Sequence, residues 1–125
     1  MAIDRKLREA LRELGEADVL AFGPVGFAAT VLPVTVAYQT LADRLRADGG
    51  ADLVPHLDRL VAEASPAGKV YAATLLAEVD PNAAREAWRR LAADRAEFTT
   101  FSGCVMNRTS LAEYAAANLT PGATA

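Results

Sequence analysis

An uncharged stretch near the start of the chain restricts most strongly what it can fold into. Val19–Ala42, read as VLAFGPVGFAATVLPVTVAYQTLA, holds 24 residues without a formal charge, between Asp18 and Asp43. About 20 apolar residues are enough to cross a bilayer as a helix. The stretch must therefore enter a membrane or be covered by the rest of the protein.

The residues inside this stretch favour burial in a globular protein over a membrane span. Gly23, Pro24 and Gly26 form a cluster typical of a turn, and Pro33 interrupts the part that follows. Beyond Pro33 the apolar residues share one helical face while polar ones lie elsewhere, as in an amphipathic globular helix. That apolar face holds Val34, Tyr38, Leu41 and Leu45. We expect a buried core segment, and membrane attachment through 19–42 remains an alternative.

Length and composition predict one small domain. The chain has 125 residues, of which 52% are hydrophobic and 23% charged, the usual balance of a globular protein. We expect a single helical domain over 1–119 and a loose tail over 120–125. Alanine supplies much of the apolar fraction, so the core needs close backbone approach and a few large side chains. The candidates for these are Phe22, Phe27, Tyr38, Tyr71, Trp88, Phe98, Phe101 and Tyr114.

Apolar periodicity and capping residues predict a series of short helices. Ser65-Pro66 and Asp80-Pro81 each place a capping side chain before a proline in the first helical turn. The expected helices cover 4–14, 25 or 33 to 47, 52–64 with Asp52 as its cap, 66–79, 81–94, and a last one opened by Ser110 and Glu113. Short connections make neighbouring helices antiparallel. The expected fold is all-α, a small bundle or superhelix of five to six helices resembling HEAT-type hairpins.

One segment lacks a helical pattern. Residues 97–106, EFTTFSGCVM, are apolar, aromatic and β-branched, and they contain Gly103. We expect an extended or irregular crossing packed against the helices.

Two motifs carry a resemblance to other proteins. Ser65-Pro-Ala-Gly-Lys-Val-Tyr71 is followed by Leu75-Leu76, Asp80-Pro81 and then Thr99-Thr-Phe-Ser-Gly-Cys104. Over about residues 60–118 the chain resembles an uncharacterised group of bacterial all-helical proteins with a Ser/Thr-Pro-x-Gly-Lys/Arg-x-Tyr stretch before a Ser-Gly-Cys. The resemblance implies a helical fold and no particular activity.

Few side chains in the sequence are candidates for catalysis or metal binding. Cys104 is the only thiol and His56 the only imidazole, so a Cys–His nucleophile pair is one hypothesis. The alternative is a buried structural cysteine behind Gly103 and a surface histidine. Neither residue belongs to a cluster with metal-ligand spacing, so we expect no metal and no cofactor. One cysteine also forbids an internal disulfide, which favours a reducing, cytoplasmic setting.

The charge pattern indicates the kind of partner. The net charge is −3 and no basic stripe stands out, so we expect no nucleic acid partner. A group of arginines, Arg85, Arg89, Arg90 and Arg95, is most simply a solvated face, and it is the candidate surface for an acidic protein.

These observations favour a non-catalytic interaction protein of the bacterial cytoplasm, such as an immunity or adaptor protein. The alternative is an enzyme or small-molecule binder that uses Cys104. The sequence does not indicate the oligomeric state.

Overall fold

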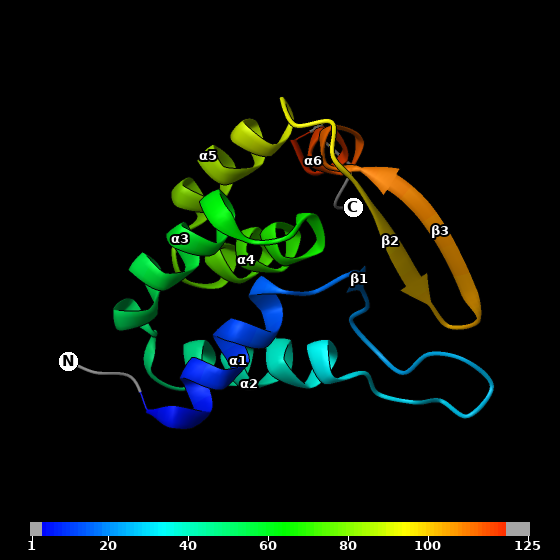
Figure 1. Ribbon diagram of the computed structural model, residues 1–125. Coiled ribbons are helices and arrows are strands. Elements are labelled where there is room, and N and C mark those ends of the chain that lie inside the picture. The colour runs from blue at the N-terminus through cyan, green and yellow to red at the C-terminus, as the bar shows by residue number, and fades with distance from the viewer. Residues whose placement is uncertain (1–3, 120–125) are drawn as a thin grey trace.

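The computed structural model describes residues 4–119 and consists mainly of helices, with a small sheet at one end (Figure 1). The elements in chain order are α1 (Arg5–Gly15), β1 (Val19–Leu20), α2 (Pro33–Asp48), the 3₁₀ turn η1 (Ala51–Leu53), α3 (Val54–Glu63), α4 (Pro66–Val79), α5 (Pro81–Leu91), β2 (Glu97–Ser102), β3 (Val105–Ser110) and α6 (Leu111–Leu119).

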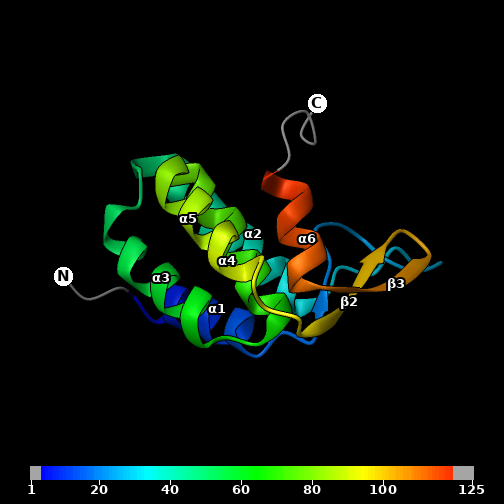
Figure 2. The same cartoon turned by 90° about the horizontal axis from the view of Figure 1, so that it is seen from above.

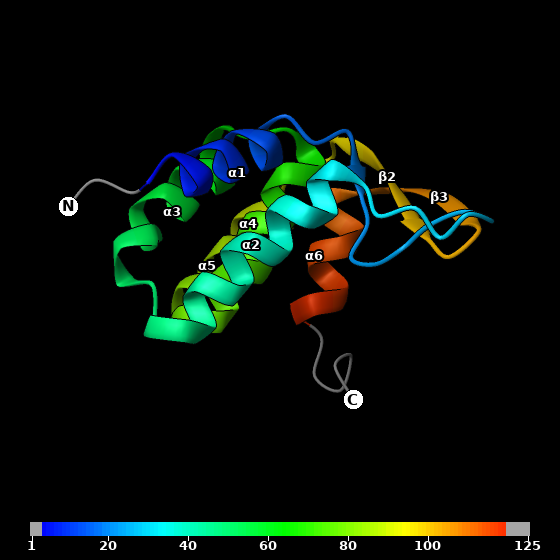
Figure 3. The same cartoon turned by 90° about the horizontal axis from the view of Figure 1, so that it is seen from below.

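Helix α4 lies at the centre of the fold. It contacts α1, α2, α3 and α5 as well as strands β1 and β2, and Figures 2 and 3 show it enclosed by the other helices. Its residues are apolar or small on nearly every side, which is the pattern of a helix buried all round. Fully buried positions along it include Val70, Tyr71, Leu75 and Leu76. The predicted core positions of this helix are confirmed for Val70, Tyr71 and Leu75.

The predicted caps set the ends of the central helices. The Ser65 hydroxyl accepts a hydrogen bond from the Gly68 N–H (3.2 Å), and the Asp80 carboxylate accepts one from the Ala83 N–H (3.1 Å). Helix α4 therefore covers the expected 66–79, whereas α5 ends at Leu91, three residues earlier than expected.

The prediction of an all-α fold is wrong for one part of the chain. A three-stranded sheet has the order β1-β2-β3, in which β1 is parallel to β2 and β2 is antiparallel to β3. The expected crossing over 97–106 is a strand and the turn of a β-hairpin. Gly103 takes a φ of 60° at that turn, a conformation that glycine adopts without steric cost. Val19 pairs with Thr99, so the strand partner comes from the other end of the chain.

Two further details of the helical prediction are decided by the structure. Of the two expected starts of α2, Pro33 is confirmed and Val25 is not. Asp52 caps no helix: η1 precedes α3, and the Asp52 carboxylate accepts a hydrogen bond from Arg44 (3.0 Å). The helices also gather around α4, whereas in a HEAT-type superhelix each hairpin contacts only its neighbours.

Residues 4–119 contain no helix with the length and apolar character needed to span a bilayer.

The Ser65–Tyr71 motif joins the start of α4 to the segment that follows α1. The Ser65 N–H donates to the Gly15 carbonyl (3.0 Å), and its hydroxyl donates to the Ala17 carbonyl. Gly68 lies directly against the carbonyl oxygen of Leu14. The motif therefore brings the end of α1 onto α4.

Tyr71 completes this junction one turn further along. Its buried hydroxyl donates to the Ala21 carbonyl (2.6 Å) and accepts from the Ala21 N–H (2.8 Å). The Thr35 hydroxyl donates to the same carbonyl (2.8 Å). Both backbone groups of Ala21 are thereby satisfied inside the core.

The Gly68→Ala variant should be destabilised by about 1–3 kcal/mol, because its added Cβ would collide with the Leu14 carbonyl oxygen. Urea unfolding of the purified protein measures this. Gly23→Ala is the matched control, since its Cβ would meet nothing within 4 Å. Equal stability of the two variants would show that α1 and α4 do not approach this closely.

Tyr71→Phe should also cost about 1–3 kcal/mol of unfolding free energy, because it leaves the buried Ala21 N–H without an acceptor. The control is Tyr38→Phe, whose hydroxyl makes no hydrogen bond within residues 4–119. If the two variants melt alike, the hydroxyl of Tyr71 does not hold Ala21.

Candidate functional site

Two uncharged segments meet at one end of the molecule. The loop between β1 and α2 belongs to the uncharged stretch 19–42, and the β2–β3 turn belongs to residues 98–107, which also carry no formal charge. Figures 1 and 3 show the loop and the hairpin projecting together beyond the helices. The Gly26 N–H donates to the Gly103 carbonyl (2.8 Å), which joins the two segments.

Large apolar side chains are exposed on both segments. Phe27 has a relative exposure of 103%, and Val105 and Met106 reach 58% and 60%. The surface that we call the apolar end is formed by Phe22, Phe27, Val31, Val105 and Met106.

The expectation that Phe22 and Phe27 belong to the core is therefore wrong. Ala21 and Val25 take the buried positions of this loop, at 1% and 4% exposure, and the two rings lie outside them.

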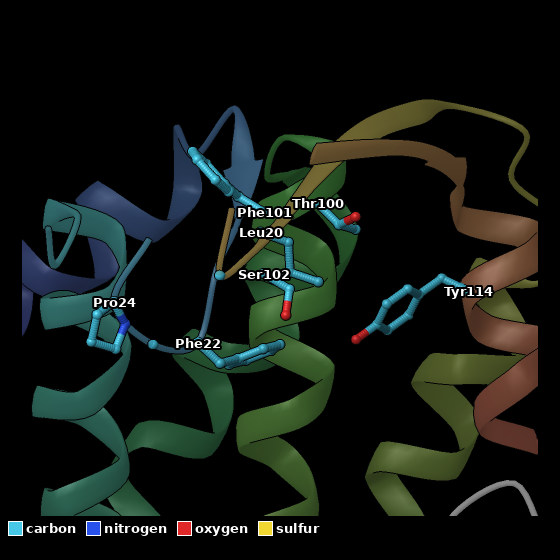
Figure 4. Close-up of a pocket in the computed structure, with 9 residues that line it drawn as sticks. Leu20, Phe22, Pro24, Thr100, Phe101, Ser102 and Tyr114 are labelled. Atoms are coloured by element: carbon cyan, nitrogen blue, oxygen red, sulfur yellow. The ribbon is translucent and has the colours of Figure 1, made fainter. Parts of the chain in front are cut away.

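A pocket of about 390 Å³ opens between these segments and α6 (Figure 4). Figure 4 shows the hydroxyls of Ser102 and Tyr114 pointing into the same space beside the ring of Phe22. The lining residues are Leu20, Phe22, Gly23, Pro24, Thr100, Phe101, Ser102, Gly103 and Tyr114. None of them carries a formal charge, and a volume of this size accommodates an aromatic ring or a small ligand.

Aromatic contacts fix the walls of the pocket. Phe22 packs edge-on against Tyr38 and Tyr71, with ring centroids 4.9 and 5.3 Å apart. Tyr114 contacts Phe98 and Trp88 at 5.7 and 5.9 Å. Such edge-on and tilted ring pairs add to the energy of apolar burial and hold side chains in place. The pocket is thus built on the core.

The polar groups of the pocket are neutral hydrogen-bonding groups. The hydroxyls of Ser102 and Tyr114 make no hydrogen bond within the described part of the chain. Burial raises the pKa of Tyr114 above the ordinary tyrosine value, so its hydroxyl stays protonated at neutral pH. The site can bind an uncharged apolar or aromatic group and can offer it two hydroxyls.

The proposed Cys–His pair is not brought together. Cys104 is exposed in the β2–β3 turn, which corrects the expectation of a buried cysteine, and it does not line the pocket. His56 is exposed on α3, and Figures 1 to 3 place α3 and the hairpin on opposite sides of the molecule. Among residues 4–119, no three His, Cys, Asp or Glu side chains gather in a way that could hold a metal ion.

The arginine group lies on a separate surface. Arg85, Arg89 and Arg90 are exposed on α5, and Arg95 is exposed just beyond it. Arg89 forms an ion pair with Glu86. Figure 1 places α5 away from the hairpin.

Sequence reasoning missed the pocket, although part of its signal was visible. Local sequence patterns mark 19–42 as an uncharged stretch but do not indicate that 98–107 is a second such segment that pairs with it. Tyr114 comes from a third segment, and only the fold brings all three together.

A scan of protein-family models finds no match to this chain, and the searches of curated proteins and of solved structures find none either.

Alkaline pH should unfold the protein as its tyrosines ionise. Burial raises the pKa of Tyr38, Tyr71 and Tyr114 above the unfolded value of about 10. The associated stability is complete below that pH and is lost as pH rises through the folded-state values, because the unfolded chain releases these protons first. Phenolate absorbance should therefore rise together with loss of circular dichroism. Ionisation of all three tyrosines near pH 10 in a chain with native dichroism would contradict their burial.

Proposed function

We propose that this protein is a non-catalytic protein–protein interaction module that binds through its apolar end, in the manner of a bacterial cytoplasmic immunity or adaptor protein. The observation that carries the proposal is the exposure of Phe27 together with Val105 and Met106 on two joined segments. Exposed apolar side chains that gather in one place are typical of interaction surfaces.

The backbone beneath these side chains supports the proposal. The Ala21 junction with Tyr71 anchors the start of the loop, and the bond between Gly26 and Gly103 anchors its middle to the hairpin. An anchored loop loses little conformational freedom when a partner binds, which favours affinity. A large aromatic side chain at the centre of such a surface is the common kind of binding hot spot.

The arginine face is the other surface that the sequence suggests. Exposed arginines contribute electrostatic complementarity and association rate, whereas desolvated aromatic anchors contribute most of the binding energy. We therefore assign the main contact to the apolar end. The two surfaces lie on different elements, so an experiment can separate them.

Site-specific photo-crosslinking tests the assignment. A photoreactive amino acid at position 27 should give a covalent protein adduct in the cells that produce the chain, because Phe27 lies in the proposed contact. The same amino acid at position 90 on α5 is the matched control and should give little. Adducts are detected on gels and identified by mass spectrometry.

The outcomes separate the hypotheses. An adduct from position 90 but not from position 27 would transfer the function to the arginine face, and no adduct from either would overturn the proposal. Cys104→Ala and His56→Ala should leave the adduct from position 27 unchanged, because the proposed contact needs neither a thiol nor an imidazole. If the adduct is lost in either variant while the fold is intact, the result would favour the alternative hypothesis of an enzyme or small-molecule binder that uses Cys104.

A further inference from the structure

We infer that the partner of the apolar end is a second copy of this chain, with Phe27 of each copy seated in the neutral pocket of the other. The inference rests on the proposed function and names the occupant of that surface.

Phe27 lies at the tip of a tight, fixed loop. Val25 and Thr30 exchange two backbone hydrogen bonds (2.8 and 2.9 Å), and the Ala29 N–H donates to the Gly26 carbonyl (3.1 Å). Ala29 has a φ of 51°, which is unfavourable for a residue with a Cβ. In this strained loop the ring of Phe27 projects into solvent and is fully exposed.

The pocket suits such a ring. It has a volume of about 390 Å³, with apolar and aromatic walls that include Leu20, Phe22 and Tyr114. The unpartnered hydroxyls of Ser102 and Tyr114 can donate to backbone carbonyls of an incoming loop, and a loop tip carries such groups. An uncharged pocket favours this neutral side chain over a charged one.

The charge distribution favours a second copy at this surface. The chain has a net charge of −3, so two copies repel each other in most orientations. The segments 19–42 and 98–107 carry no formal charge, so two copies can meet at the apolar end without placing like charges together. Like-charge repulsion therefore opposes self-association least at this end.

The geometry also allows the assembly to close. The loop that carries Phe27 follows directly after the pocket residues Phe22, Gly23 and Pro24. The Phe27 ring and the pocket therefore lie at the same end of the molecule. A two-fold axis then makes both insertions at once and leaves neither pocket open to a third copy. The expected product is a dimer and not a fibre.

Sedimentation velocity of the whole protein over a range of concentrations tests the dimer. Reductant is present so that Cys104 cannot join two copies through a disulfide. The wild type should dimerise, and Phe27→Asp should weaken the association by roughly 100-fold or more, because two ring insertions are lost. Ala51→Asp, an exposed alanine in η1 next to α3, adds the same charge away from the hairpin and should dimerise like the wild type.

A second variant separates insertion into the pocket from unspecific apolar association. Gly23→Trp adds a large ring to the pocket lining at a position with free space and without a positive φ. If Phe27 must enter the pocket, this variant should be monomeric. Nonspecific apolar association would instead make the Gly23→Trp variant associate more strongly than the wild type, and that result would overturn the inference.

The remaining outcomes distinguish this inference from the proposed function. A monomeric wild type whose position 27 crosslinks to a different protein would overturn the dimer and leave the interaction module in place. A monomer that gives no adduct at position 27 would overturn both. A monomer that binds phosphatidylcholine vesicles, but not after Phe27→Asp, would assign the apolar end to lipid and overturn the second copy.

Discussion

The two hydrogen bonds between the Tyr71 hydroxyl and the backbone of Ala21 are the contact on which the rest of this structure depends. They lie where the chain leaves β1 and enters the uncharged loop. A backbone segment entering the core brings an N–H and a carbonyl that must both be satisfied. One tyrosine on the central helix satisfies both, and Thr35 on α2 adds a third bond to the same carbonyl. Ala21 is therefore fixed in the protein interior, and the loop that follows starts from a fixed point.

The surface follows from this anchor. Because Ala21 and Val25 occupy the buried positions, the intervening Phe22 is left half outside, where its ring packs edge-on against Tyr38 and Tyr71. The bond from Gly26 to Gly103 then binds the loop to the hairpin turn. A long uncharged run, which in isolation resembles membrane-spanning sequence, thus contributes both core packing and an exposed apolar surface. Most charged residues lie on the helices, and Glu97 and Arg108 form an ion pair on the hairpin beyond its uncharged part.

The helical part of the fold could be predicted because its signals are local. Ser65 and Asp80 cap the helices that they precede, through hydrogen bonds to residues three positions further on. The sheet could not be predicted in this way. Strand β1 has only two residues, and Val19 pairs with Thr99 across almost the whole chain. The β-branched pattern of 97–106 therefore indicates an extended segment but does not indicate which segment pairs with it. The prediction that Phe27 belongs to the core is wrong for a related reason. Hydrophobicity favours burial, and only the strained loop around Ala29 shows that the Phe27 ring points away from the core.

The most direct test of this account measures the exposure of the Phe27 ring by fluorine NMR. The protein carries 4-fluorophenylalanine at its four phenylalanine positions, and a soluble gadolinium chelate is present. In dilute solution the chelate should broaden the Phe27 signal strongly and leave that of the buried Phe98 unchanged. As concentration rises, the Phe27 signal should become protected, because its ring enters the pocket of a second copy. A Phe27 signal protected at every dilution would show that this ring belongs to the core, and one exposed at every concentration would show that no second copy covers it.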